Sequence, residues 1–274
     1  MKKRNWVFDP KTNIDSIVYS IKDYFSHDSA NHGANAVIGI SGGKDSTVVA
    51  MLCIKALGRE RVIGVMMPDG YQNDIDDSRA VCDSLGIMNY EVNIGPICSA
   101  FYDAVNIAKQ DGDRVATNTP PRVRMAMLYA IATMNHGRVM CTSNYSEGFI
   151  GWSTKFGDEC GDYAPLGNYT ATEVVEMGKV LAEELGLDMN LITKAPDDGM
   201  CGLTDEEKFG FSYAELDAYI RNENISDMPI EIMEKISAMR KGSRHKHSMP
   251  HSPCVARSYL DEQGNLFQEE CFEF

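Results

Sequence analysis

The chain has 274 residues and a formal net charge of −14, because 40 aspartates and glutamates outweigh 26 lysines and arginines. A surface of this sign argues against nucleic acid or an anionic membrane as the main partner, so an anionic ligand must meet a local basic site. The length suffices for one large α/β domain with a complete core. We expect a single domain over residues 1–274, with a surface tail near 255–274.

The N-terminal segment and the cysteines indicate a cytoplasmic protein. Basic residues near the start are not followed by an apolar stretch, and no apolar run is long enough to span a bilayer. The eight cysteines are scattered, with no C-x-x-C and no close Cys/His cluster. We therefore expect reduced, mostly buried thiols rather than a zinc site.

Short apolar strands alternate with helical patterns along the chain. The helical patterns expected first lie at 14–25, 45–57, 74–85 and 97–109, and a later one carries Arg122 and Arg124. The expected strands lie at 36–40, 61–67, 88–94 and 137–142. This alternation predicts an α/β fold, a doubly wound parallel sheet with helices on both faces and a ligand at the carboxyl ends of its strands. Ser41 and Thr142 fall at two such ends.

A glycine-rich segment joins the first expected strand to an apolar helix: residues 39–46 read Gly-Ile-Ser-Gly-Gly-Lys-Asp-Ser. Its glycines let the backbone approach phosphate oxygens, and free amides at a helix start favour negative charge. Lys44 adds a positive charge, and Asp45 adds a hard oxygen ligand suited to Mg²⁺. The spacing fits neither a Walker A loop nor a dinucleotide fingerprint. It resembles the Ser-Gly-Gly-x-Asp-Ser loop of ATP pyrophosphatase-type enzymes; the alternative is a glycine-rich turn that binds nothing.

The stretch 143–168 is expected to be a long glycine-rich loop, and loops of this length in compact domains are usually functional. It interleaves glycines and aromatic residues with charges of both signs, including Glu147, Lys155, Asp158 and Asp162. Each charge alone is more often solvated than catalytic, but the set beside a phosphate loop favours a site. Asp45 and Glu147 are suited to sharing one Mg²⁺ held against ATP phosphates.

With these residues in view, the chain resembles the ammonia-dependent NAD synthetases over nearly its whole length. The matching stretches are Gly39–Ser46, Gly64–Pro68, Asn118–Met125, Lys155–Asp158 with Asp162 and Pro165-Leu166, Lys194–Pro196, Asp205–Glu207, and His245-Lys246 with Pro250. The resemblance implies an adenine nucleotide alpha hydrolase-like fold. It also implies that a carboxylate of nicotinic acid adenine dinucleotide (deamido-NAD) attacks the α-phosphate of ATP, and that ammonia then converts the acyl-adenylate to NAD⁺ and AMP.

The resemblance also implies roles for individual residues, carried over by position. Asp158 would accept a proton from incoming ammonium, and Asp45 and Glu147 would bind Mg²⁺ as part of the catalytic set. The implied ATP contacts are Gly39, Ile40, Ser41, Gly42, Gly43, Lys44, Asp45, Ser46 and Thr142. The implied contacts of deamido-NAD are Arg122, Lys155, Asp162, His245 and Lys246. A homodimer, with ammonia from an external source, completes the implied assembly.

Two positions depart from the family pattern. Ala171 stands where the family usually has a lysine that contacts ATP, and Asp197 stands where it usually has Ser or Thr. We expect Lys44 to supply part of the missing charge; the alternative is that Lys44 points to solvent. Two other functions also stay open: a related amide-forming or thiolation enzyme acting on GMP or tRNA, and a non-enzymatic adenine-nucleotide-binding module on the same fold.

Overall fold

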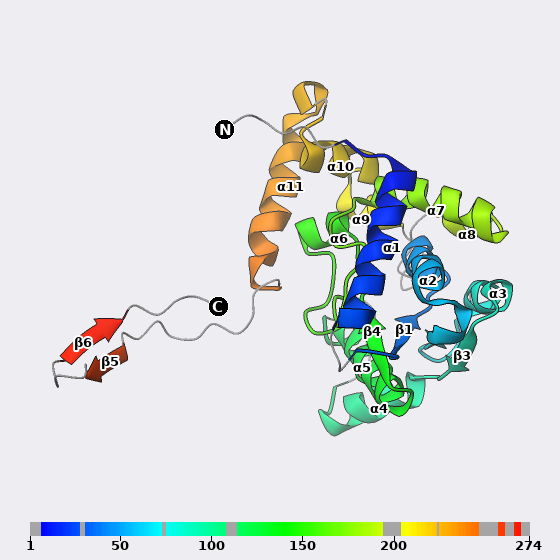
Figure 1. Cartoon of the computed structure of the whole chain (residues 1–274). Coiled ribbons are helices and arrows are strands. Elements are labelled where there is room, and N and C mark those ends of the chain that lie inside the picture. Colours follow the sequence, from blue (N-terminus) through cyan, green and yellow to red (C-terminus); the bar gives the residue numbers. More distant parts are fainter. Residues whose placement is uncertain are drawn as a thin grey trace.

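The computed structural model describes residues 7–27, 31–72, 75–107, 114–193, 204–223, 225–246, 257–260 and 266–269 (Figure 1). Its centre is a parallel sheet with the strand order β3-β2-β1-β4. The strands are β1 (Asn35–Gly39), β2 (Val62–Met66), β3 (Met88–Glu91) and β4 (Gly137–Met140). Since β1 pairs in parallel with both β2 and β4, the strand order reverses between β1 and β4. This is the topological switch point at which open α/β sheets bind ligands.

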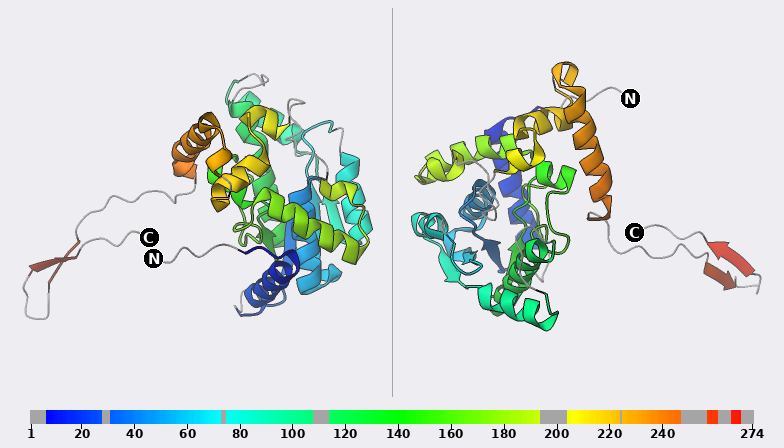
Figure 2. Two further views of the ribbon diagram at one scale, coloured as in Figure 1. Left: turned by 90° about the horizontal axis from the view of Figure 1, so that it is seen from above. Right: turned by 180° about the vertical axis from the view of Figure 1, so that it is seen from behind.

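Helices cover both faces of the sheet, so the predicted doubly wound α/β architecture is confirmed (Figure 2). On β1 the side chains alternate: Ala36 and Ile38 pack into one apolar cluster, and Val37 packs into the other. The first cluster is completed by α1 (Pro10–His27), α2 (Lys44–Leu57), α3 (Ile75–Leu85), α7 (Ala171–Leu185) and α8 (Asn190–Thr193). The second is completed by α4 (Gly95–Ala104) and α5 (Arg114–Met134).

A third apolar cluster lies beyond the sheet and includes Ile150, Phe209, Tyr213 and Ile236. It joins α6 (Tyr145–Ile150), α9 (Asp205–Phe209), α10 (Tyr213–Arg221) and α11 (Ile230–Ser243). Short 3₁₀ helices occur at η1 (Arg59–Arg61), η2 (Ile225–Asp227) and η3 (Arg244–Lys246). Within the expected tail, β5 (Arg257–Leu260) and β6 (Leu266–Glu269) form an antiparallel pair.

One expectation about local structure is wrong. The stretch 143–168 is not a continuous loop, because it contains the helix α6. A capping box starts this helix: the Asn144 side chain accepts from the backbone N–H of Glu147, and the Glu147 side chain accepts from the backbone N–H of Asn144. Gly151, in the left-handed conformation, ends it. Among the described residues, no helix is long and apolar enough to cross a membrane.

Candidate active site

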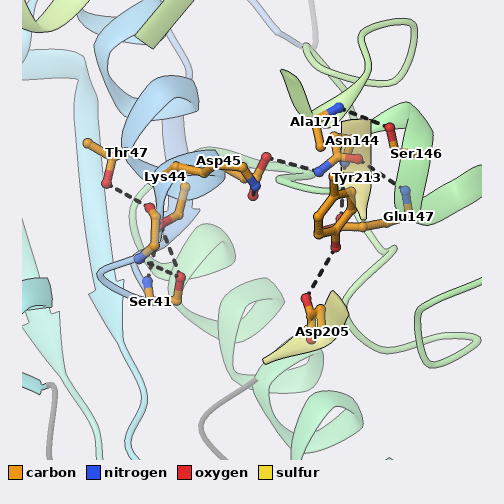
Figure 3. Close-up of polar contacts among 12 residues, drawn as sticks. Ser41, Lys44, Asp45, Thr47, Asn144, Ser146, Glu147, Ala171, Asp205 and Tyr213 are labelled. Carbon is orange, nitrogen blue, oxygen red and sulfur yellow. Dashed lines mark hydrogen bonds and ion pairs between the residues drawn. The ribbon is translucent and has the colours of Figure 1, made fainter. Parts of the chain in front are cut away.

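The predicted phosphate loop leaves the carboxyl end of β1 and enters α2 (Figure 3). Its conformation is fixed by its own hydroxyls: Ser46 Oγ and Thr47 Oγ1 donate to the Gly43 carbonyl at 3.1 and 2.8 Å, and Gly43 N donates to Ser41 Oγ at 3.2 Å. Gly42 has φ +79°, and a Cβ at this position would lie 2.9 Å from Cβ of Asp77. The loop therefore requires glycine at position 42 on both conformational and steric grounds.

The N-terminus of α2 is suited to an anion. Its N-cap is Gly43, so no side chain caps the first amides of the helix. Uncapped amides at a helix start carry a partial positive charge and bind phosphate oxygens. The structure thus places the segment from Gly39, the last residue of β1, to Ser46, in the first turn of α2, at the sheet's switch point. Thr142, two residues beyond the end of β4, lies at the carboxyl end of the neighbouring strand.

Two predicted cation ligands, Asp45 and Glu147, are joined by a buried asparagine. Asn144 is 2% exposed. Its Nδ2 donates to Asp45 Oδ1 at 3.1 Å, and its Oδ1 accepts from the Glu147 backbone N–H at 3.1 Å. Asp45 comes from the first turn of α2 and Glu147 from the first turn of α6. Residues remote in sequence therefore bring two carboxylates to one place.

The electrostatics of this carboxylate pair fit a hard divalent cation. Burial, followed by the charge of Asp45, raises the pKa of Glu147 to about 8, while Lys44 acts in the opposite direction. Two carboxyl groups that disfavour each other's charge are stabilised by a cation between them. Asp45 and Glu147 would hold Mg²⁺ at this position. No cluster of three or more Asp, Glu, His or Cys side chains suited to a metal occurs within the described part of the chain.

Lys44 points into the site and not to solvent. Its side chain is 6% exposed, and Nζ lies 2.7 Å from Asp45 Oδ2 and 5.6 Å from the centre of the Tyr213 ring. Burial alone would lower the pKa of this ammonium group, but the neighbouring carboxylates of Asp45, Glu147 and Asp205 hold it above its ordinary value. The lysine is therefore a fixed positive charge within the carboxylate group.

The site contains three polar residues that the sequence prediction did not assign: Asn144, Asp205 and Tyr213. Tyr213 donates from its hydroxyl to Asp205 Oδ2 at 3.2 Å, and both side chains are buried. They come from α10 and α9, which pack on α6 through the third apolar cluster. The sequence does contain a sign of the position of Asn144, because Asn144 and Glu147 form an Asn-x-x-Glu pattern, which is typical of a capping box at a helix start. For Asp205 and Tyr213 only the packing of separate helices reveals the contact.

Four of the predicted dinucleotide contacts form a second group. Lys155 Nζ donates to the His245 carbonyl at 2.6 Å, and Arg122 Nε donates to the Lys155 carbonyl at 3.3 Å. Lys246 Nζ donates to the carbonyls of Gly151 and Ser153 at 2.7 and 2.6 Å. Arg122 and His245 are exposed. An acidic protein thus gathers a basic group of the kind that an anionic ligand requires.

Asp158 lies between the two groups. Its Oδ1 accepts from the Thr154 backbone N–H at 2.7 Å, and its carbonyl accepts from Ser143 Oγ at 3.3 Å. Desolvation raises the pKa of this carboxyl, and Lys246 acts in the opposite direction. Arg124, which donates to the Met67 carbonyl at 3.0 Å, also interacts with the charge of Asp158. Asp158 is therefore a carboxylate with a proton affinity above the ordinary value, next to the basic group.

Asp162 has its contacts at β4 and α5. It accepts from the Val139 backbone N–H at 2.8 Å and from the Tyr129 hydroxyl at 3.3 Å. Its neighbours line a separate hollow with His136 and Arg138, where α5 meets β4.

Ala171 and Asp197 are the two positions that depart from the family pattern. Asp197 lies outside the described residues. Ala171 begins α7, is 2% exposed, and packs in the third apolar cluster beside Tyr213. Its backbone N–H donates to Ser146 Oγ at 2.9 Å. Tyr213, whose ring centre lies 5.6 Å from Lys44 Nζ, belongs to the same cluster as Ala171.

Comparison with known proteins decides the family. The model of the NAD synthase family matches residues 13–250. The chain belongs to the NAD synthase family. An NH(3)-dependent NAD(+) synthetase of Pyrococcus furiosus is 36% identical over 261 residues, covering 89% of this chain and 96% of that protein. This similarity extends over most of the chain, in agreement with the family resemblance that the sequence motifs indicate.

Two solved structures agree with the fold. The NMN synthetase of Francisella tularensis superposes with a TM-score of 0.79 at 30% identity, covering 90% of this chain and 99% of that chain. The NH3-dependent NAD synthetase of Campylobacter jejuni superposes with a TM-score of 0.72 at 24% identity, with the same coverage of 90% and 99%. The latter similarity supports the fold alone.

Proposed function

We propose that the chain uses ATP to amidate deamido-NAD with ammonia, giving NAD⁺, AMP and pyrophosphate. The observation that carries this proposal is the convergence, in a member of the NAD synthase family, of an uncapped phosphate loop with the carboxylates Asp45 and Glu147. The proposed chemistry has two steps. The nicotinate carboxylate attacks the α-phosphorus and pyrophosphate leaves; ammonia then attacks the acyl carbon, and AMP leaves.

The residues have separate tasks in this scheme. The amides of the loop stabilise charge on the phosphates, and Lys44 adds a positive charge beside them. When bound, Mg²⁺ supplies charge neutralisation at the phosphate oxygens. Ammonium is not a nucleophile, so Asp158 holds it and accepts its proton. The raised pKa of Asp158 supports this task, because a stronger base removes that proton more readily.

The basic group binds the anionic part of the dinucleotide. Arg122, Lys155, His245 and Lys246 offer exposed or half-buried donors within one contact network. Asp162, which faces a different hollow, would contact the dinucleotide from a second copy of the chain. The exposed apolar residues Ile97 and Phe101 of α4 and Val105, which follows its last residue, are spaced by four and support a homodimer. Sedimentation equilibrium tests this assembly.

A smaller substrate is the second candidate. The structural similarity to an NMN synthetase, at a TM-score of 0.79 and 30% identity, favours testing nicotinic acid mononucleotide beside the dinucleotide. Both substrates present the same carboxylate, so the same loop and carboxylates serve either one. The dinucleotide also carries an adenylate group, which needs a binding surface on the protein; the mononucleotide lacks this group.

Release of pyrophosphate from ATP, measured with purified protein, tests the proposal. We expect release that requires both ammonium and deamido-NAD, with NAD⁺ as the product. A higher kcat/KM with the mononucleotide would select the second candidate. Release that instead requires GMP or tRNA, or ATP binding without any release, would overturn the amidation proposal and select one of the other two readings of the loop.

A further inference from the structure

Asn144 contacts both residues that would hold the cation. Its carboxamide contacts the Asp45 carboxylate and the Glu147 backbone N–H, and its own backbone N–H donates to the Glu147 carboxylate. The Glu147 backbone N–H is a donor, so it must meet Oδ1 of Asn144, at 3.1 Å. The Nδ2 group then faces Asp45 Oδ1, also at 3.1 Å, and an ionised carboxylate only accepts. Figure 3 shows the side chain lying between the start of α2 and α6. The orientation of the amide is therefore dictated by its two partners.

The other hydrogen bonds of Asp45 and Glu147 do not connect these two residues to each other, so Asn144 is the link between them. Asp45 Oδ2 is held by Lys44 Nζ at 2.7 Å, so its two oxygens are fixed from two directions. Glu147 Oε2 accepts from the Asn144 backbone N–H at 3.3 Å. The body of α6 is anchored separately, because Ser146 Oγ donates to Asp217 and accepts from Ala171 N. Loss of the Asn144 side chain would thus leave α6 attached but Asp45 no longer tied to it.

We propose that Asn144 is a positioning residue that fixes the separation and orientation of Asp45 and Glu147, and thereby sets the affinity of the site for a divalent cation. The inference rests on the proposed function, since that function requires Mg²⁺ at this pair. Hydrogen-bond partners behind metal ligands typically contribute about 10- to 100-fold in metal affinity, because they fix the ligands before the metal arrives.

The helix-capping task of Asn144 is separable from this link. Serine caps helices about as well as asparagine, so Asn144→Ser retains an acceptor for the Glu147 N–H. The serine side chain is too short to reach Asp45 as well, so only the link is lost. Ser212 offers a matched control: its Oγ accepts from Glu215 N at 3.2 Å in a similar capping box on α10. Ser212→Ala removes a cap and leaves the contacts of Asn144 in place.

Binding of Mn²⁺ to the ATP-free protein, followed by the loss of its free electron paramagnetic resonance signal, tests the proposal without turnover. We expect Asn144→Ser to melt within a few degrees of wild type and to bind Mn²⁺ roughly tenfold more weakly. Steady-state assays should show a raised Mg²⁺ requirement with kcat restored at high Mg²⁺. Ser212→Ala should melt lower and bind Mn²⁺ as wild type does.

An Mn²⁺ affinity of Asn144→Ser within about threefold of wild type would overturn the inference, because the change then falls short of the expected range. Wild-type protein that takes up no Mn²⁺ would overturn it as well. Failure of the proposed function is recognised differently: wild-type protein would bind Mn²⁺, and Asn144→Ser would bind it more weakly, yet neither would form NAD⁺.

Discussion

Lys44 occupies a position where a positive charge is ordinarily unfavourable. The first turn of a helix carries a partial positive charge, so a lysine there is opposed by the dipole of α2. The contact with Asp45 and the nearby charges of Glu147 and Asp205 offset this, and the side chain is 6% exposed. The alternative in which Lys44 points to solvent is therefore wrong. A buried lysine in this loop is explained if a bound triphosphate brings additional negative charge to the site.

Replacement of Lys44 tests that explanation. Lys44→Gln should raise the ATP requirement or lower turnover by roughly 10- to 100-fold, which corresponds to about 1.4–2.7 kcal/mol. Ala171→Lys should not restore the activity, because Ala171 is 2% exposed and a lysine would overpack the third apolar cluster. Steady-state kinetics in ATP measure both effects. A Lys44→Gln enzyme within about threefold of wild type would show that the ammonium does not act on ATP.

Asp45 and Glu147 should respond to neutralisation of their charge without unfolding. Asp45→Asn and Glu147→Gln keep the size of each side chain and remove its anionic oxygen. We expect each to lower turnover at least about 100-fold, as for an electrostatic contact of a few kcal/mol in the transition state. Melting temperatures should stay close to wild type. Near-native turnover in either variant would remove that residue from the proposed cation site.

At the residue level, the sequence is most informative where a predicted site is one continuous segment. The loop from Gly39 to Ser46 is continuous in sequence, so its anion-binding character was readable from glycines and a following helix. Asp205 and Tyr213 were missed because the contact of Tyr213 with Lys44, and the effect of the Asp205 charge on Lys44, depend on how α9 and α10 pack on α6. Such packing is fixed by apolar contacts between remote segments, which a short motif does not contain.

At the scale of elements, α6 shows how a short helix is held in place by contacts with its neighbouring helices. The helix covers Tyr145–Ile150, and a helix of that length is not stable alone. Its capping box and the bonds of Ser146 to Asp217 and Ala171 supply the missing support. Asp217 also accepts from N and Oγ1 of Thr172, at 2.8 and 2.7 Å, and so joins α10 to α7. One buried carboxylate thus connects the helices around Glu147.

Asp217 should make the stability of the fold depend on pH. Burial raises the pKa of this carboxyl, although its hydrogen bonds act in the opposite direction. The folded protein therefore holds this proton more tightly than the unfolded chain, and the contribution to stability is lost as pH rises above the ordinary value of about 4. We expect Asp217→Asn to cost about 1–3 kcal/mol at pH 4, and less at pH 7. Urea unfolding of both proteins across this range measures the difference. A cost that grows with pH would contradict the assigned direction.

The elements themselves were predicted with uneven success, for a physical reason. The strands β1 and β2 are buried on both faces and appear in the sequence as apolar runs, so their positions were predicted to within a residue or two. The stretch 143–168 contains many glycines, and its polar, glycine-rich composition concealed α6. The helix forms because tertiary contacts override a weak local preference.

At the scale of the whole molecule, two features determine where the site forms: the strand order of the sheet and the packing of the third apolar cluster. The sheet's reversal between β1 and β4 places the phosphate loop and Thr142 on neighbouring strands. The third cluster then carries Tyr213 and the helix of Glu147 to the same edge. The sequence pattern predicted the first part, because parallel strand–helix repeats have few allowed topologies. It did not predict the second, since the helices from α9 to α11 belong to no such repeat.

The cysteines that the structure describes bear on the nitrogen source of the reaction. Release of ammonia from glutamine requires a nucleophile, most often a cysteine whose pKa is lowered by its surroundings. Burial instead raises the pKa of Cys53, Cys82, Cys141 and Cys160, that of Cys82 to about 11. We therefore expect ammonium to support NAD⁺ formation by the purified chain. Glutamine at equal concentration should support less than about a hundredth of that rate, which is the loss expected when a nucleophile is absent.

The measurement is NAD⁺ formed per enzyme with each nitrogen source, and the control is added glutaminase, which should restore the rate with glutamine. Equal rates with glutamine alone, in a preparation without glutaminase, would contradict the expectation and indicate a thiol nucleophile among the residues that the structure does not describe.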